Sequence, residues 1–403
     1  MDFDAIVIGG GPSGAAAATR LAELGWHVAI IERAEFPRLK VCGEYLSWTN
    51  WEAFRRLGVW EEFASLAGPA IRRVAFFGPS RNTTTATLPA PPETQQEEWG
   101  RALTRDHLDS LLLRQAKHKG AVVFQPWNVV QTNRDATVWQ VTIAPGQHAT
   151  DARELTAPMI LHAAGSWGRT PLDAEVPAAR DKDLLGFKAH FSDAALVAGL
   201  MPLLAFPGGY GGMVTAQDGI VSLSCCVQQS RLRLLRSQSS ASAGKTILEH
   251  IQTNIPAVAQ ILRGATQQGS WLAAGPIRPG RRVVYSDGVF RVGNAAGEAH
   301  PVVAEGISMA VQSGLLAADC ISACCQSHRL SAPQIDQAGY LYRKRWHRAF
   351  ALRIRASKAI AAWAMQPSAV RWSEPAIRRF PSILTAGARL GGKSHIINFQ
   401  EQA

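Results

Sequence analysis

The sequence predicts an α/β fold with a parallel βαβ core, an antiparallel sheet inserted into it, and a helical C-terminal region. Three observations lead to this prediction. An apolar strand, a glycine-rich turn and an alanine-rich helix follow one another within residues 3–24. Between Gly186 and Val227 the chain changes to short apolar runs broken by Gly and Pro, which is typical of antiparallel strands. From Gln337 onward the spacing is helical and the segment is strongly basic.

The first βαβ unit occupies residues 3–31. Phe3 to Ile8 is apolar and β-branched, which predicts a buried strand. Ser13 to Leu24 is rich in alanine and predicts a helix, which Gly25 ends. His27 to Ile31 predicts a second strand, parallel to the first.

The remaining elements follow from periodicity and turn residues. In chain order we expect a helix at Asp106–Lys119, strands at Ala121–Phe124, Val138–Ile143 and Met159–Ala163, antiparallel strands around Phe187–Phe191, Leu203–Phe206 and Ile220–Val227, helical structure over Leu232–Leu262, a strand at Val283–Val292, and a helix at Ile307–Cys325. This order predicts a discontinuous nucleotide-binding domain (1–75, 100–169 and 281–330), a substrate domain (76–99 and 170–280) and a basic helical region (331–403).

Composition limits the classes of partner and site. Among 403 residues there are 42 Lys+Arg and 31 Asp+Glu, a net charge of +11. This charge favours a lipid headgroup or an acidic protein as partner over nucleic acid, because no RNA-binding aromatic motif or zinc-finger spacing occurs. No C-x-x-C pair is present, so no metal site is expected. The acidic first residues and the lack of a long apolar run predict a cytoplasmic protein, in contact with a membrane at most peripherally.

A glycine pattern links the first strand to the first helix. The G-x-G-x-x-G residues are Gly9, Gly11 and Gly14. They allow a sharp turn, close approach of the backbone to a pyrophosphate, and tight packing of helix on strand. Glu32 ends the second strand, where a carboxylate can accept hydrogen bonds from ribose. Together these features predict a Rossmann-like dinucleotide site, with Ser13 and Arg33 as further contacts, and they do not distinguish FAD from NAD.

A second segment, Gly293 to Ile307, reads GNAAGEAHPVVAEGI. It resembles the late G-D-A-A-G-x-x-x-P-x-x-G-E-G-I stretch of the geranylgeranyl reductase family of FAD-dependent oxidoreductases, within the wider group of aromatic hydroxylases and flavin halogenases. The resemblance implies FAD, with Asn294 at the ribityl chain and Gly306 and Ile307 at the flavin ring. The chain departs from the pattern at Asn294, where the family has Asp, and at Ala304, where it has Gly.

Phe36 to Ser47, FPRLKVCGEYLS, is similar to the K-x-C-G-G-x-L-S pattern of the same family. The resemblance places this stretch beside the flavin, so that Cys42, Gly43 and Glu44 are expected at the active site. Glu44 replaces the second glycine of the pattern. Cys42 is a candidate proton donor, or alternatively a cysteine that only packs in a loop.

Three further positions follow from the resemblance. Arg105 matches an Arg that contacts the cofactor; the alternative is a solvated side chain at a helix start capped by Thr104 or Asp106. Val129 is expected to touch adenine through its backbone. His300, beside the expected ring position, is either a general base or a structural histidine.

Two reaction types and one non-enzymatic role remain open. The first is a monooxygenase that hydroxylates an aromatic or hydrophobic substrate through a flavin hydroperoxide, with His300 or Glu44 as base. The second is a reductase of isoprenoid double bonds, with Cys42 or water as proton source. The third is a flavin-binding partner protein without catalysis. The Trp-x-Trp-x-Ile-Pro motif of halogenases is absent. NAD(P)H is a candidate transient electron donor, since no second nucleotide fingerprint occurs.

The C-terminal region interleaves basic and apolar residues. Arg343, Lys344, Arg345 and Arg348 alternate with apolar positions, and residues 382–392 repeat this character. Such a pattern fits a peripheral membrane contact or an acidic protein partner, and it also fits an ordinary solvated helix face.

Overall fold

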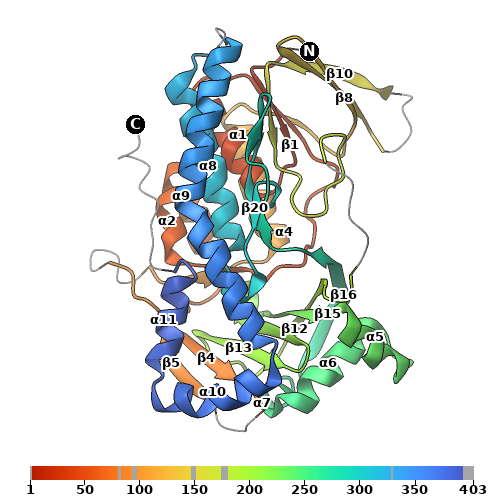
Figure 1. The fold of residues 1–403 in the computed structure, drawn as a ribbon, viewed down its shortest axis with the longest axis vertical. Helices are drawn as coiled ribbons and strands as arrows, with labels where there is room; N and C mark the ends of the chain where they lie inside the picture. Colours follow the sequence, from red (N-terminus) through yellow and green to blue (C-terminus); the bar gives the residue numbers. More distant parts are fainter. Residues whose placement is uncertain are drawn as a thin grey trace.

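The computed structural model describes residues 2–79, 83–92, 98–146, 151–173, 180–327 and 330–393. It confirms the α/β class. Two large sheets lie at opposite ends of the long axis, and one long helix runs beside both (Figure 1). The two cavities described below lie where the two halves meet.

The first sheet is the nucleotide-binding core predicted from the N-terminal residues. Its strands are parallel, except that the edge strand β18 runs antiparallel to β19. Their short apolar runs are buried on both faces, as is typical of a parallel sheet covered from both sides. In spatial order the strands are β18 (Tyr285–Ser286), β19 (Val289–Arg291), β11 (Met159–His162), β1 (Ala5–Ile8), β2 (Val28–Ile31) and β7 (Val122–Phe124).

Side chains of β1 alternate between two layers. Ala5 and Val7 pack with the helices, whereas Ile6 and Ile8 pack with a three-stranded antiparallel sheet. The helices of this layer are α1 (Pro12–Glu23), α4 (Arg105–His118) and α8 (Gly306–Cys324), and the small sheet contains β8 (Asn128–Asp135), β9 (Val138–Ala144) and β10 (Arg153–Ala157). α8 is long and apolar enough to cross a membrane, but 78% of its apolar window is buried inside the protein, as in a core helix.

The second sheet is largely antiparallel, with β13 and β4 as a parallel pair. On β12, Phe187, Ala189 and Phe191 face a core formed with helices, while Lys188 and His190 point to the opposite face, towards the first sheet. The strands in order are β16 (Thr266–Ile277), β12 (Leu184–Ser192), β15 (Val221–Gln228), β14 (Gly209–Thr215), β13 (Leu200–Phe206), β4 (Arg73–Phe77) and β5 (Thr84–Thr87), and the covering helices are α5 (Gln229–Ser237), α6 (Ala243–Asn254) and α7 (Pro256–Ile261).

Shorter elements join the halves. Two-stranded pairs form between β3 (Tyr45–Leu46) and β6 (Arg101–Ala102), and between β17 (Gly280–Arg281) and β20 (Gly297–Glu298); helices α2 (Trp51–Arg56) and α3 (Trp60–Leu66) lie between β3 and β4 in the chain. These connections bring the Cys42 loop and the Asn294 loop to the junction of the two sheets.

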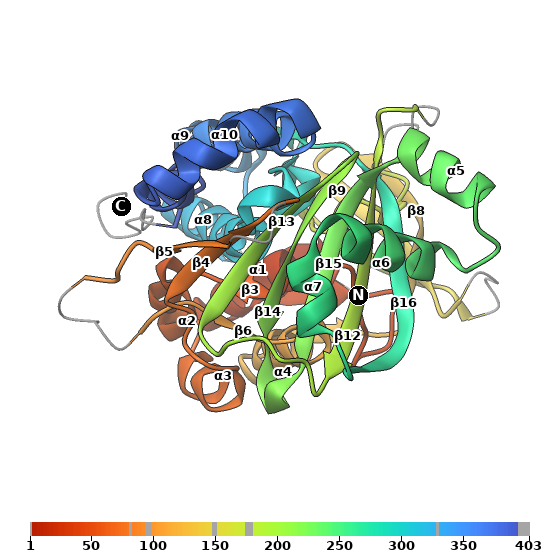
Figure 2. The same ribbon diagram turned by 90° about the horizontal axis from the view of Figure 1, so that it is seen from below.

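The C-terminal region is helical, as expected. α9 (Ala332–Ala364) buries Trp346, Phe350 and Ile354 in the main core, so its apolar face is used inside the protein. α10 (Pro367–Arg379) and α11 (Ser382–Leu390) then pack at the end of the molecule that carries β4 and β5 (Figure 2). These three buried residues of α9 therefore cannot serve as a membrane contact, whereas Tyr340 and Leu352 of the same helix are exposed.

Two sequence expectations need correction. Residues 283–292 form a hairpin rather than one strand, because Asp287 and Gly288 adopt positive φ values of 52° and 75° and reverse the chain. The helical stretch over 232–262 consists of three helices. The division into three domains stays a prediction, and parts of the predicted domains (1, 80–82, 93–97, 147–150, 174–179, 328–329 and 394–403) lie outside the described residues.

Candidate active site

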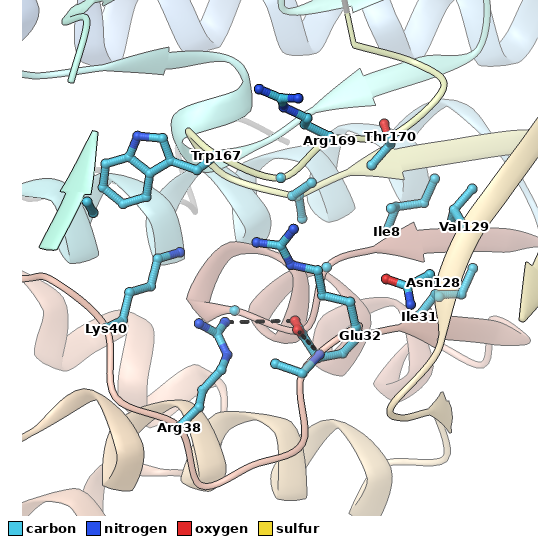
Figure 3. A pocket seen from close by; sticks show the side chains of 18 of the residues that line it. Ile8, Ile31, Glu32, Arg38, Lys40, Asn128, Val129, Trp167, Arg169 and Thr170 are labelled. Carbon is cyan, nitrogen blue, oxygen red and sulfur yellow. Dashed lines mark hydrogen bonds and ion pairs between the residues drawn. The ribbon is translucent and has the colours of Figure 1, made fainter. Parts of the chain in front are cut away.

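A first cavity of ≈ 460 Å³ opens at the carboxyl ends of β1 and β2. In Figure 3 the side chains that line it come from these strands, from β8 and from the loop after β11. Of the residues predicted to bind the nucleotide, it is lined by Gly9, Gly11, Glu32, Arg33 and Val129. Such a crevice beyond the strand ends is the usual ligand position in an open α/β sheet.

The glycine turn needs its glycines for different reasons. Gly9 has φ +109°, and a Cβ there would lie 2.5 Å from the carbonyl oxygen of Ala163. Gly14 does not line the cavity, and a Cβ on it would overlap the carbonyl oxygen of Gly9, so Gly14 permits close packing of α1 on β1. Gly11 has only the end of Arg38 near its Cβ position, at 3.8 Å. The start of α1 therefore presents backbone N–H groups without a side-chain cap to the cavity.

Glu32 is held in place by backbone donors. Its carboxylate accepts hydrogen bonds from the N–H of Gly10 at 2.8 Å and of Ala34 at 2.9 Å. Arg38 approaches the same carboxylate at 3.8 Å (Figure 3). These contacts fix the acidic group at the end of β2, where it faces the cavity and retains lone pairs for further donors.

A second cavity of ≈ 210 Å³ lies between the first sheet and the second. Five residues line both cavities, which shows that the two adjoin: Gly11, Lys40, Val41, Ala163 and Trp167. Most of the remaining predicted site residues line the second cavity: Ser13, Cys42, Gly43, Glu44, Arg105, Asn294, Gly306 and Ile307. The structure thus brings together residues up to about three hundred positions apart in the chain.

The N-terminus of α8 opens onto the second cavity. A Cβ on Gly306 would meet no atom within 4 Å, and Glu305, the residue before it, makes no side-chain capping hydrogen bond. The first N–H groups of the helix are thus available to a group in the cavity, and their partial positive charge favours an anionic one.

Cys42 and Arg105 form a second wall. Arg105 is buried and pairs with Asp109 through two hydrogen bonds of 2.7 Å. Its guanidinium also contacts the thiol of Cys42. Arg105 is therefore not solvated, and Thr104 makes no side-chain capping bond to the helix.

Glu44 lies at the centre of a buried charge cluster. Its carboxylate accepts bonds from Lys188, from Nε2 of His190 at 2.9 Å and from the N–H of Arg105 at 2.9 Å. Burial alone would raise the pKa of Glu44, but the His190 hydrogen bond and the Lys188 charge outweigh it and lower the pKa. Because three partners already occupy its carboxylate, Glu44 is poorly placed to accept a proton as a general base.

The backbone explains why the family pattern has glycine at this position. Glu44 has φ 61°, in the left-handed region that favours glycine. Ala304, the other place where a family glycine is replaced, has φ 51° and ψ 42°. Both residues that replace a family glycine therefore lie at left-handed positions beside the second cavity.

His300 lies behind the cavity wall rather than in it. The hydroxyl of Tyr210, which lines the second cavity, is 2.5 Å from Nδ1 of His300. Burial lowers the pKa of His300 to about 4, and the charge of Lys358 acts in the same direction. His300 is thus neutral at physiological pH and reaches the cavity only through Tyr210. The glycine-rich segment around Tyr210 belongs to the β13–β14 hairpin.

The amide of Asn294 has a carboxylate beside it. Asn294 donates to Ser166 at 2.8 Å and to Glu298 at 3.3 Å, and Arg282 lies 3.4 Å from the other oxygen of Glu298. Burial raises the pKa of Glu298, opposed first by the charge of Arg282. Glu298 also lines the second cavity. A carboxyl group missing at Asn294 is thus present four residues later.

A family comparison agrees with this geometry. The family described as "FAD binding domain" matches residues 2–329. The chain belongs to the FAD-binding domain family. Its cofactor is FAD, and its resemblance to the geranylgeranyl reductase-like group of FAD oxidoreductases is confirmed.

Proteins of several different descriptions are similar to this chain. Conditioned medium factor receptor 1 of Dictyostelium discoideum is 25% identical over 78% of this chain, which spans 62% of that protein's length. Digeranylgeranylglycerophospholipid reductase 1 of Methanopyrus kandleri is 22% identical, with 87% of each chain covered. The structure of flavin-dependent brominase Bmp2 superimposes with a TM-score of 0.76 at 17% identity, covering 98% of this chain and 94% of that one. These neighbours support an FAD-dependent oxidoreductase and show the fold alone beyond that.

The two adjoining cavities fit FAD. The first presents the glycine turn and Glu32 to the adenine and ribose end, with Val129 beside it. The second presents open space over Gly306 and the free N–H groups of α8, as a flavin ring requires. Lys40 lines both cavities, and its ammonium group would be available to the phosphates that connect the two ends of FAD.

Sequence reasoning missed several residues of this site. Lys188 and His190 were detectable as polar positions alternating with Phe187, Ala189 and Phe191 in a strand, a pattern that marks a functional face. Glu298 and Trp167 gave no such signal, because their roles depend on packing between the Asn294 loop and the loop after β11.

Proposed function

We propose that this FAD-dependent oxidoreductase is a monooxygenase that hydroxylates an aromatic substrate carrying a hydroxyl group, held in the second cavity. When bound and reduced, FAD supplies the activation of oxygen for such a reaction. The observation that supports the proposal is the pair formed by Tyr210 and His300 at the cavity wall.

The pair determines which hydrogen-bonding group the cavity offers. His300 is neutral, and in its tautomer with the proton on Nε2 the Nδ1 atom accepts the Tyr210 hydrogen, so that the Tyr210 oxygen presents lone pairs to the cavity. Burial raises the pKa of Tyr210, so the phenol stays protonated. A substrate O–H that donates to this oxygen is oriented, and its ring gains electron density. An electron-rich ring is what an electrophilic oxygen donor attacks.

The rest of the cavity wall fits a hydrophobic ring. Apolar side chains from β13 and β14 line it on the side of the second sheet: Met201, Leu203, Met213 and Val214. Such walls exclude water from the reacting atoms, which protects an activated oxygen species from wasteful breakdown.

A direct test combines anaerobic photoreduction of the bound flavin with a pulse of ¹⁸O₂ and a panel of phenolic substrates. Incorporation of one labelled oxygen into product supports the proposal. Tyr210→Phe should lower kcat/KM about tenfold, the value of one lost positioning hydrogen bond. Bound flavin that cannot be reduced would instead indicate a non-catalytic flavin-binding protein.

A reductase of isoprenoid double bonds is the second candidate, because Cys42 lines the same cavity. In this reaction reduced FAD, when bound, would supply the hydride that one alkene carbon takes, and Cys42 would give its thiol proton to the neighbouring carbon. Saturation of an isoprenoid substrate without oxygen uptake, lost in Cys42→Ala, would favour this candidate over the monooxygenase. The electron donor, for which NAD(P)H remains the prediction, is varied in both assays.

A further inference from the structure

The outer faces of α10 and α11 expose large apolar side chains. Trp372 is 86% exposed, Phe380 59%, Ile383 45% and Leu390 61%. Trp372 lies on the solvent face of α10, Phe380 in the connection, and Ile383 and Leu390 on the solvent face of α11. Isolated exposed apolar residues need no explanation, but four on one helical hairpin form a patch that favours an interaction.

Arginines surround this patch. Four exposed arginines belong to the same hairpin: Arg371, Arg378, Arg379 and Arg389. Within the described part of the chain none of the four forms an ion pair with a carboxylate. Aromatic and aliphatic side chains among cations are the composition of helices that lie in the interface of an anionic bilayer. The net charge of +11 adds attraction to such a surface.

The inner faces of the same helices reach the active site. Val370, Ile377 and Leu384 pack in one hydrophobic cluster with Met201 and Val214, which line the second cavity. Just beyond α11, Lys393 is buried, donates to the Val303 carbonyl at 2.7 Å and pairs with Glu305 at 3.0 Å. The hairpin therefore lies between solvent and the cavity, attached to the loop that precedes α8.

We propose that the α10–α11 hairpin is a docking surface for an anionic phospholipid bilayer, from which a lipid-soluble substrate enters the second cavity. Trp372, Phe380, Ile383 and Leu390 insert at the headgroup boundary, and the four arginines contact lipid phosphates. The entry of a lipid-soluble substrate rests on the proposed function, whereas the docking on a bilayer does not. Lipid is favoured over an acidic protein because the four apolar residues are largely exposed and line neither of the two cavities.

Vesicle binding tests the docking without catalysis. The FAD-loaded protein should sediment with vesicles of phosphatidylcholine mixed with phosphatidylglycerol, bind far less to pure phosphatidylcholine, and dissociate as salt rises. Arg378→Gln with Arg379→Gln should lower the partition coefficient about 25-fold, about fivefold for each cation removed. Bromine-substituted acyl chains should quench part of the tryptophan fluorescence, and Trp372→Phe should remove that part.

A matched control and clear refutations complete the test. Leu234→Ala changes an exposed apolar residue of α5, which both ribbon views place far from α10, and should leave vesicle binding unaltered (Figures 1 and 2). The proposal is overturned if neither vesicle binds, if the arginine variants bind like the parent, or if the patch proves to hold a second copy or an acidic protein. Vesicle binding without any oxidation of lipid-soluble substrates would remove the substrate entry and leave the docking intact, while the phenol panel with ¹⁸O₂ tests the proposed function separately.

Discussion

Replacing Glu44 by Gln should cost the folded protein about 3–5 kcal/mol, because the change leaves Lys188 charged and buried without its partner. The side chain of Lys188 is 1% exposed, and the other oxygen near its Nζ is the Lys40 carbonyl at 3.5 Å. Gln cannot neutralise an ammonium group, and it also weakens the bond to His190. The loss therefore exceeds that of an ordinary surface ion pair, which is about 0–1 kcal/mol.

Urea denaturation of the FAD-free and FAD-loaded forms measures this loss. Glu44→Gln combined with Lys188→Met should recover more than half of it, since the buried charge is then gone. Glu44→Gly should cost about 1 kcal/mol less than Glu44→Gln, because glycine adopts φ 61° without strain. Glu52→Gln, at an exposed carboxylate of α2, is the control and should change stability by less than about 0.5 kcal/mol.

The pH dependence gives an independent check on Glu44. Its pKa is lowered in the folded protein because, against the effect of burial, His190 and Lys188 favour the carboxylate. The stabilisation is therefore complete above the pKa of the unfolded chain, about 4.3, and is lost as the pH falls below it. The difference between the parent and Glu44→Gln should shrink in acid. A Glu44→Gln protein within about 1 kcal/mol of the parent at pH 7, with its fold intact, refutes the reasoning.

Three further predictions concern single residues. Ala304→Gly should leave the free energy of unfolding unchanged or raise it by up to about 1 kcal/mol in urea denaturation, because Ala304 has φ 51°; a marked loss of stability would contradict this. Burial, followed by the charge of Lys358, lowers the pKa of His300 to about 4. The stability of the parent should therefore fall as the pH drops from about 6.5 towards 4. In thermal melts, His300→Asn should flatten this dependence on pH. Burial, followed by the charges of Arg105 and Arg38, lowers the pKa of Lys40 to about 8. The affinity of the parent for FAD, measured by fluorescence titration, should therefore decline above that pH. The Lys40→Met variant should bind FAD about tenfold more weakly at pH 7 and show no such decline.

The sequence predicted the elements whose signal is local. The strand–turn–helix over residues 3–24 was predictable because β1 is apolar throughout and its turn requires glycine at Gly9 and Gly14. The Cys42 and Asn294 segments could be assigned to one site by their resemblance to a family. The reversal at Asp287 was missed, since an apolar run around a two-residue turn has the same periodicity as one strand.

Roles set by packing across the two sheets could not be predicted. His300 was expected beside the flavin ring. Instead, Tyr210 of β14 lies between His300 and the second cavity. Glu44 was expected as a base, but strand β12 places Lys188 and His190 against it. Both outcomes depend on the register of the second sheet, which no local pattern specifies.

Two of the three departures from the family pattern, at Glu44 and Asn294, gain a common meaning from this packing. Glu44 replaces a glycine at a left-handed position and is held there by Lys188 and His190. Asn294 removes a carboxylate, and Glu298 places one beside it. Each of these two changes thus alters the arrangement of carboxyl groups around the second cavity rather than deleting the site. A cavity that only stored flavin would need no such rearranged charges, whereas an enzyme acting on a different substrate from its relatives needs a different field at the reacting atoms. The departures therefore argue for altered substrate chemistry and against loss of catalysis.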